Sequence, residues 1–201
     1  MKLNKILRLK KNSFTLVELL VVISIIGLLA GLAVPAIQGG LDKAKQQVDV
    51  SNIRQCGLIA FGYANDNEGS FFGTNSSFTS TQYFTNLIGL GLLTSVKILS
   101  GNGYPSAAST NNITANNIAW GVNGPLTSSD DGMLPLFISK NIGTTPLAAT
   151  CNISSATNSW KSKGLVVYRI GNSAEFIRSD TAKNVPMGIT NNATGATVSI
   201  Q

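Results

Sequence analysis

The longest apolar run of the chain lies close to its N-terminus. From Leu19 to Ile37 there are 19 consecutive uncharged and mostly apolar residues, and Glu18 directly precedes them. A helix of that length rises about 28 Å, close to the hydrocarbon thickness of a bilayer. The run predicts a helix over residues 14–37 that spans a membrane.

Beyond Gly39-Gly40 the pattern becomes amphipathic. Apolar residues then recur mostly every three or four positions with polar residues between them, which predicts a helix over residues 38–64. The polar run at residues 65–69 should end it. Pro35 and the glycines around it predict a bend or local unwinding near residues 31–40. The apolar positions are Leu41, Ala44, Val48, Ile53, Cys56, Ala60 and Tyr63.

The remaining residues, 65–201, form one globular head with weaker signals. They are long enough for a single core. Their pattern predicts a small antiparallel sheet packed against the long helix, an α+β fold, with further short strands within the polar stretches 100–117 and 123–160. The elements expected are a short helix at 83–93, a strand at 118–122, a hairpin at 165–178 and a last strand at 196–200.

The charge of the chain is concentrated at its N-terminus. Five of the 15 basic residues lie in the first eleven positions, and the rest of the chain has 10 basic and 9 acidic residues. The net charge of +6 therefore does not indicate a nucleic-acid-binding surface. By the positive-inside rule, the basic end stays cytoplasmic and the head lies outside the cytoplasm.

The composition excludes common catalytic and metal sites. The chain contains no histidine, so Ser-His-Asp catalysis, Cys-His catalysis and His-ligated zinc are ruled out. No constellation of catalytic residues is indicated, and no cofactor is expected. Asp66, Glu68, Asp130 and Asp131 raise the question of a calcium site, but the spacing supplies too few carboxylates, and turn chemistry explains them better.

Glu18 is the feature that separates three interpretations of the apolar run. A secretory signal peptide has a shorter apolar run and a small-residue cleavage site, neither of which is present. A plain membrane anchor fits the length but leaves a costly carboxylate unexplained. The third interpretation supplies a partner for Glu18.

Residues 10–20, KKNSFTLVELL, closely resemble the processing site of type IV prepilins and type II secretion pseudopilins. The resemblance implies that residues 1–13 are a leader peptide, which prepilin peptidase removes between Ser13 and Phe14. It implies N-methylation of Phe14 and a charge pairing between Glu18 and the new N-terminal amine, in the same chain or in a neighbouring subunit. Pro35 lies where the family carries a helix-breaking proline.

The same resemblance implies a structural rather than an enzymatic role. The expected function is that of a subunit of a type IV pilus or type II secretion pseudopilus, which starts as a single-pass protein of the inner membrane. Its partners would be prepilin peptidase and other pilin or pseudopilin subunits in a homo- or hetero-filament, with the head periplasmic or extracellular. The sequence does not choose between pilus and pseudopilus.

Ser13 keeps an alternative open, because the family prefers glycine directly before the cut. Serine is small enough for a narrow peptidase subsite, or it blocks cleavage. An unprocessed chain would be a membrane-anchored, extracytoplasmic binding module.

Cys56 and Cys151 are the two cysteines of the chain. Outside the cytoplasm a disulfide between them could pin the long helix to the head. The alternative is a buried Cys56 on the helix stripe and an unpaired Cys151.

Overall fold

The computed structural model divides the chain into two units, Met1–Lys43 and Ala44–Gln201. The division falls inside one continuous helix, α1 (Leu16–Asp66). The structure describes residues 14–71, 79–142, 150–153, 159–182, 184–187 and 197–199.

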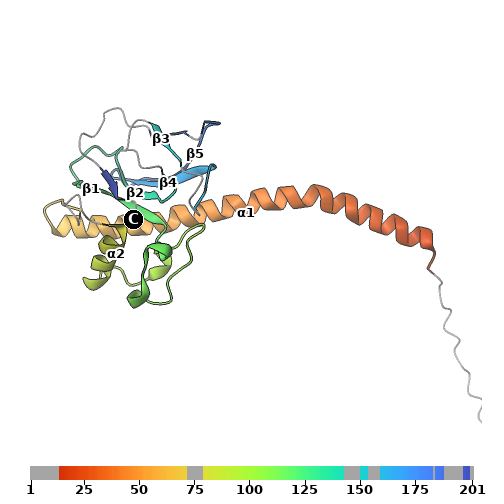
Figure 1. Cartoon of the computed structure of the whole chain (residues 1–201), viewed down its shortest axis with the longest axis horizontal. Helices are drawn as coiled ribbons and strands as arrows, with labels where there is room; N and C mark the ends of the chain where they lie inside the picture. Colours follow the sequence, from red (N-terminus) through yellow and green to blue (C-terminus); the bar gives the residue numbers. More distant parts are fainter. Residues whose placement is uncertain are drawn as a thin grey trace, which may run out of the picture. The chain divides into compact units, whose positions relative to one another are not determined.

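Helix α1 is 51 residues long and runs through Pro35 (Figure 1). The residues around Pro35 remain helical, so the local unwinding expected near 31–40 is wrong, while a bend there stays a prediction. A proline removes one backbone hydrogen bond, which the turns on either side can tolerate. The helix ends in the polar run that predicted its end, where Gly69 has a φ of 79° and its N–H donates to the Ala64 carbonyl at 2.8 Å.

The head is built on a five-stranded antiparallel sheet in the order β5-β4-β2-β1-β7. A second, two-stranded antiparallel sheet pairs β3 with β6. The strands are β1 (Trp120–Gly124), β2 (Pro135–Ser139), β3 (Thr150–Asn152), β4 (Gly164–Arg169), β5 (Ala174–Arg178), β6 (Asn184–Pro186) and β7 (Thr197–Ser199). The helical elements are α2 (Ser80–Gly89) and the short 3₁₀ helices Val96–Leu99, Thr110–Asn112 and Ala115–Asn117.

The expected α+β fold, a long N-terminal helix with a small antiparallel sheet, is confirmed. The hairpin expected over 165–178 is β4–β5, and the last strand is β7. The helix expected at 83–93 overlaps α2, which begins earlier, at Ser80, and ends at Gly89. Short strands also occur within 123–160, as expected. The strands expected within 100–117 are wrong, because this stretch forms 3₁₀ turns.

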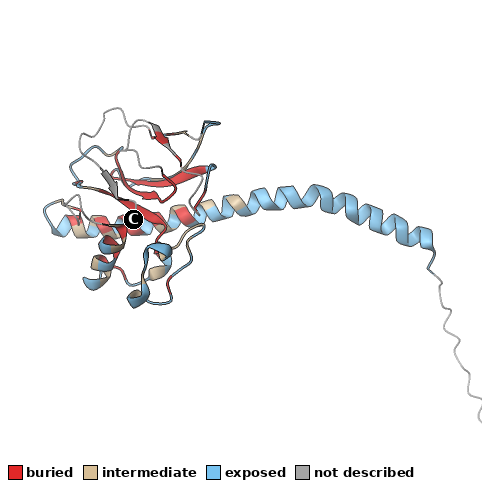
Figure 2. Ribbon diagram, viewed as in Figure 1, coloured by how far each residue is buried: buried red, intermediate tan, exposed pale blue. Residues whose placement is uncertain are grey.

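One hydrophobic core joins the second half of α1, α2 and the sheet. Figure 2 shows the buried residues gathered in the head. Gly57 of α1 lies under the ring of Tyr168 from β4, and Phe61 meets the same ring edge to face at 6.3 Å between ring centroids. From α2, Phe84 packs on Phe137 of β2 at 5.6 Å between ring centroids. The residues of α1 that face this core are Asp49, Ile53, Cys56, Gly57, Ala60 and Ala64.

Candidate functional site

The first part of α1 is the most unusual surface of the chain. Every residue from Phe14 to Leu41 is exposed, including Leu16 at 77% and Leu32 at 70% (Figure 2). Among the described helices, α1 is the one long and apolar enough to cross a membrane by its length and composition.

So much exposed apolar surface requires a partner that the unit itself does not supply. Burying a single leucine, isoleucine or valine side chain is worth about 1.5–3 kcal/mol. Contiguous apolar surfaces of this kind indicate contact with a membrane or with another protein. Leu16 to Ile37 contains two polar side chains, Glu18 and Ser24, and the Ser24 hydroxyl is satisfied by donating to the Leu20 carbonyl at 2.7 Å.

Glu18 is held at the N-terminus of α1 by Thr15. The Thr15 backbone N–H donates to Glu18 Oε2 at 2.9 Å, and the Thr15 hydroxyl donates to the same oxygen at 2.7 Å. In return, the Glu18 backbone N–H donates to Thr15 Oγ1 at 3.2 Å. This is a capping box, which satisfies backbone donors that a helix N-terminus otherwise leaves without partners.

The capping box turns the Glu18 carboxylate back onto Thr15, the residue that directly follows Phe14. A carboxylate there interacts favourably with the positive end of the helix dipole. Ser13, the other half of the predicted cleavage site, lies outside the described residues. Sequence reasoning missed Thr15, although the spacing Thr-x-x-Glu before an apolar run is the signal of a capping box.

The two cysteines do not form a disulfide in this structure. Both are buried thiols. Cys56 lies on α1 with its Sγ donating to the Ile98 carbonyl at 3.5 Å, whereas Cys151 lies on β3. The arrangement matches the alternative of a buried Cys56 on the helix stripe.

The acidic pair Asp130 and Asp131 is used in turns. Asp130 Oδ2 accepts hydrogen bonds from the Thr127 N–H at 2.6 Å and the Thr127 hydroxyl at 3.0 Å. Asp131 Oδ1 accepts from the Met133 N–H at 2.9 Å. These contacts are the turn chemistry that the sequence favoured over a calcium site.

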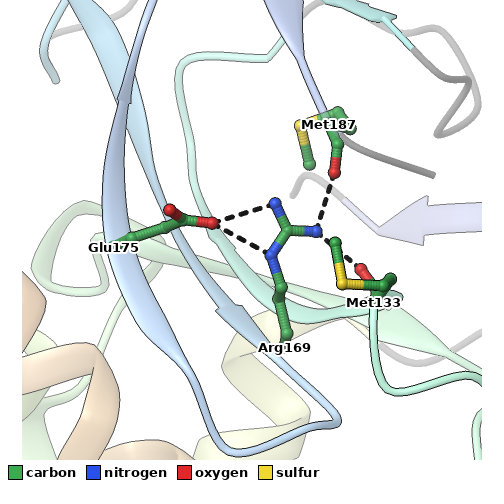
Figure 3. A network of polar contacts seen from close by, with 4 residues as sticks. All are labelled: Met133, Arg169, Glu175 and Met187. Carbon is green, nitrogen blue, oxygen red and sulfur yellow. Dashed lines mark hydrogen bonds and ion pairs between the residues drawn. The ribbon is translucent and has the colours of Figure 1, made fainter.

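Three charged side chains of the head are buried, although nothing in the sequence pattern predicts it: Arg169, Asp49 and Lys140. Arg169 on β4 donates through Nη1 to the carbonyls of Met133 and Met187, and through Nε and Nη2 to Glu175 Oε1 (Figure 3). It therefore ties the start of β2 and the end of β6 to the sheet. Asp49 of α1 is a second buried charge.

Asp49 is 4% exposed and accepts hydrogen bonds from two loops of the head. Its Oδ2 accepts hydrogen bonds from Trp160 Nε1 at 2.8 Å and from the Asn102 backbone N–H at 3.0 Å. Burial raises the pKa of the Asp49 carboxyl above its usual range, and the two hydrogen bonds partly oppose that rise. We call Asp49, Asn102 and Trp160 the Asp49 latch.

Comparison with known proteins finds similarity at the N-terminus. Residues 8–34 match the family described as the prokaryotic N-terminal methylation motif. The chain is 50% identical over 44 residues to the type II secretion system core protein G of Aeromonas hydrophila. It is 52% identical over 44 residues to the protein of the same name from Escherichia coli K12.

These matches cover 22% of this chain and 31% and 30% of the two relatives, so the chain spans about a third of their length. No solved structure matches the chain. The similarity therefore concerns the exposed helix and its beginning. The N-terminal segment of this chain carries the prokaryotic N-terminal methylation motif, as the resemblance of residues 10–20 predicted.

Proposed function

We propose that this chain is a structural subunit of a type II secretion pseudopilus or a type IV pilus. The observation that carries the proposal is the apolar first part of α1, which is exposed from the methylation motif to Leu41, with Glu18 turned back toward its start. The two relatives from Aeromonas hydrophila and Escherichia coli are type II secretion system core proteins, which favours the pseudopilus.

In this proposal, prepilin peptidase hydrolyses the peptide bond between Ser13 and Phe14. The basic leader, residues 1–13, remains on the cytoplasmic side, and the new amine of Phe14 receives a methyl group. Before assembly the exposed helix lies in the inner membrane, and the head lies outside the cytoplasm. In the filament, helices of neighbouring subunits replace the lipid around the apolar residues.

Glu18 has a different task before and after cleavage. In the uncut chain its carboxylate is satisfied by Thr15. Cleavage creates a positive amine at Phe14, and within an apolar environment an unpaired charge is strongly disfavoured. Glu18 then neutralises this amine, and pairing between subunits makes assembly the state in which both charges are matched.

The first test is the intact mass and the N-terminal residue of the protein from its native cell. A chain that begins at Phe14 and carries one methyl group supports the proposal. Ser13→Gly is the matched control, because it restores the residue that prepilins prefer. A chain that still begins at Met1, and that is cut only as Ser13→Gly, contradicts processing of the native chain and leaves the anchored binding module.

A second test separates the two tasks of Glu18. Glu18→Gln retains an acceptor for the capping box but removes the charge, whereas Thr15→Ala removes the cap and retains the charge. We expect Glu18→Gln to be cleaved but to fail to enter filaments, and Thr15→Ala to enter them. Filaments of normal yield from Glu18→Gln would contradict the charge pairing.

A further inference from the structure

The chain contains two Asn-Gly sequences in very different surroundings. Asn102-Gly103 lies in a turn at the surface of the head, where Asn102 is half-buried and Gly103 is exposed. Asn123-Gly124 lies in β1, where Asn123 is 2% exposed. Asn-Gly is the sequence in which an asparagine side chain most readily reacts with the backbone, because glycine leaves its own nitrogen sterically open.

The turn at Asn102-Gly103 is short and closed by the residues on either side. The Gly101 N–H donates to the Tyr104 carbonyl at 3.1 Å, and the Tyr104 N–H donates to the Gly101 carbonyl at 2.9 Å. Gly103 has a φ of 82°, which a glycine adopts without strain. Among the described residues, the Gly103 N–H donates to no backbone carbonyl. The attacking nitrogen is therefore available.

The second Asn-Gly sequence is protected by the sheet. Asn123 Nδ2 donates to the Pro135 carbonyl at 2.9 Å, and Asn123 pairs with Val198 of the neighbouring strand. The amide is fixed, and water does not reach it. The two Asn-Gly sequences should therefore differ in reactivity, because their local structures differ.

We propose that Asn102 is a site of spontaneous deamidation, which places a second carboxylate beside the Asp49 latch. The Gly103 backbone nitrogen attacks Asn102 Cγ, and a C–N bond forms. The bond from Cγ to the side-chain nitrogen breaks, and the nitrogen leaves as ammonia with the proton of the Gly103 amide. Water then opens the cyclic imide at either carbonyl, giving aspartate or isoaspartate at position 102.

The consequence follows from the position of Asp49. Asn102 donates its backbone N–H to Asp49 Oδ2 at 3.0 Å, so the two residues are direct neighbours. Asp49 is buried, and the N–H groups of Asn102 and Trp160 that donate to its carboxylate are uncharged. A new carboxylate at position 102 repels Asp49, and isoaspartate also lengthens the backbone of the turn. Deamidation therefore weakens the hydrogen bonds by which Asn102 and Trp160 hold two loops of the head to Asp49 of α1.

The site is tested by isotope labelling of the full-length chain in detergent. The protein is incubated in mildly alkaline buffer made with H₂¹⁸O, and its peptides are mapped by mass spectrometry. We expect one ¹⁸O atom at position 102, as a mixture of aspartate and isoaspartate, with Asn123 unchanged over the same time. Labelling at Asn123 first, or no labelling at Asn102 beyond that of other asparagines, overturns the proposal.

The effect on the latch is tested with the product made by mutation. We expect Asn102→Asp to raise the unfolding equilibrium constant of the head roughly tenfold, as repulsion between neighbouring, partly buried charges predicts. Asn112→Asp is the matched control, because Asn112 is an exposed asparagine of a 3₁₀ turn. The loss should shrink when Asp49→Asn removes the buried charge.

An equal loss in Asn102→Asp and Asn112→Asp overturns the link to Asp49, and so does a loss that persists unchanged with Asp49→Asn. The labelling result does not depend on filament assembly. Its failure is therefore distinguishable from a failure of the proposed function.

Discussion

Gly57 of α1 provides the sharpest test of how the helix meets the sheet. A Cβ atom at this position would lie 2.0, 2.1 and 2.4 Å from three carbons of the Tyr168 ring. Carbon atoms in ordinary contact are about 3.5–4 Å apart, so the ring or the helix would have to move by roughly 1.5 Å.

The ring of Tyr168 has little freedom to move. Its hydroxyl donates to Asn172 Oδ1 at 3.0 Å, and its ring stacks on Phe137 with centroids 6.2 Å apart. Overpacking of a filled core costs about 1–3 kcal/mol, and sometimes more. Alanine gains about 1 kcal/mol over glycine in a helix interior. Because the Cβ would come as close as 2.0 Å to the ring, we place the cost at the upper end of that range, about 3 kcal/mol. After the helix gain is subtracted, Gly57→Ala should lower the free energy of unfolding by about 2 kcal/mol.

Gly62→Ala is the matched control on the same helix. Gly62 is exposed, and a Cβ there would meet nothing within 4 Å. This variant should gain up to about 1 kcal/mol from helix propensity. The assay is urea unfolding of the full-length chain in detergent, followed by tryptophan fluorescence. If Gly57→Ala is as stable as Gly62→Ala, the ring of Tyr168 does not lie on Gly57, and the packing described for α1 is wrong.

Three further predictions concern the buried charges of the head. Asp49→Asn should stabilise the head at neutral pH. Because the pKa of Asp49 is raised in the folded state, the contribution of Asp49 to the free energy of unfolding falls as pH rises above the ordinary carboxyl pKa of 3.8. Asp49→Asn should lack this fall, and urea unfolding at two pH values would detect the difference. Burial lowers the pKa of the Lys140 amine to about 8, so above that pH the folded chain holds fewer protons than the unfolded chain. The free energy of unfolding of the native protein should therefore rise relative to that of Lys140→Met between about pH 8 and 9. This window lies below the ordinary pKa of the cysteine thiols, so their ionisation does not disturb the comparison. A difference that is flat with pH would contradict this. Arg169→Met should cost about 3 kcal/mol, because it leaves the buried Met187 carbonyl and the partly buried Met133 carbonyl without their donor. Glu175→Gln should cost under about 1 kcal/mol, because the Glu175 side chain is 51% exposed; thermal unfolding compares the two variants.

The elements that the sequence predicted well are those whose physics is local. The period of apolar residues was sufficient for α1, because a helix of this length and composition requires no tertiary contact to be recognised. The β4–β5 hairpin was predicted from two apolar runs around a Gly-Asn-Ser turn. In both cases, neighbours in sequence supply the decisive interactions.

The features that the sequence did not predict depend on residues far apart in the chain. The Asp49 latch joins residues 53 and 111 positions apart, and nothing near Asp49 distinguishes it from an exposed helix acid. Arg169 appeared to be one residue of an apolar strand. In residues 100–117 the polar composition did not separate short strands from the 3₁₀ turns that the structure contains.

The capping box explains the order of the proposed steps, in which the helix folds first, cleavage follows and assembly comes last. Thr15 and Glu18 satisfy one another without any other subunit, so the helix can begin at Leu16 before Ser13 and Phe14 are separated. The Glu18 carboxylate is then already turned toward the place where the proposed cleavage would create an amine. A helix without that cap would leave backbone N–H groups at its start without partners, which lowers helix stability but does not remove the charge. Glu18, which the proposal requires for assembly, is thus already held in place by the capping box when the helix folds. Glu18→Gln keeps the capping acceptor and removes the charge, so it should affect assembly alone.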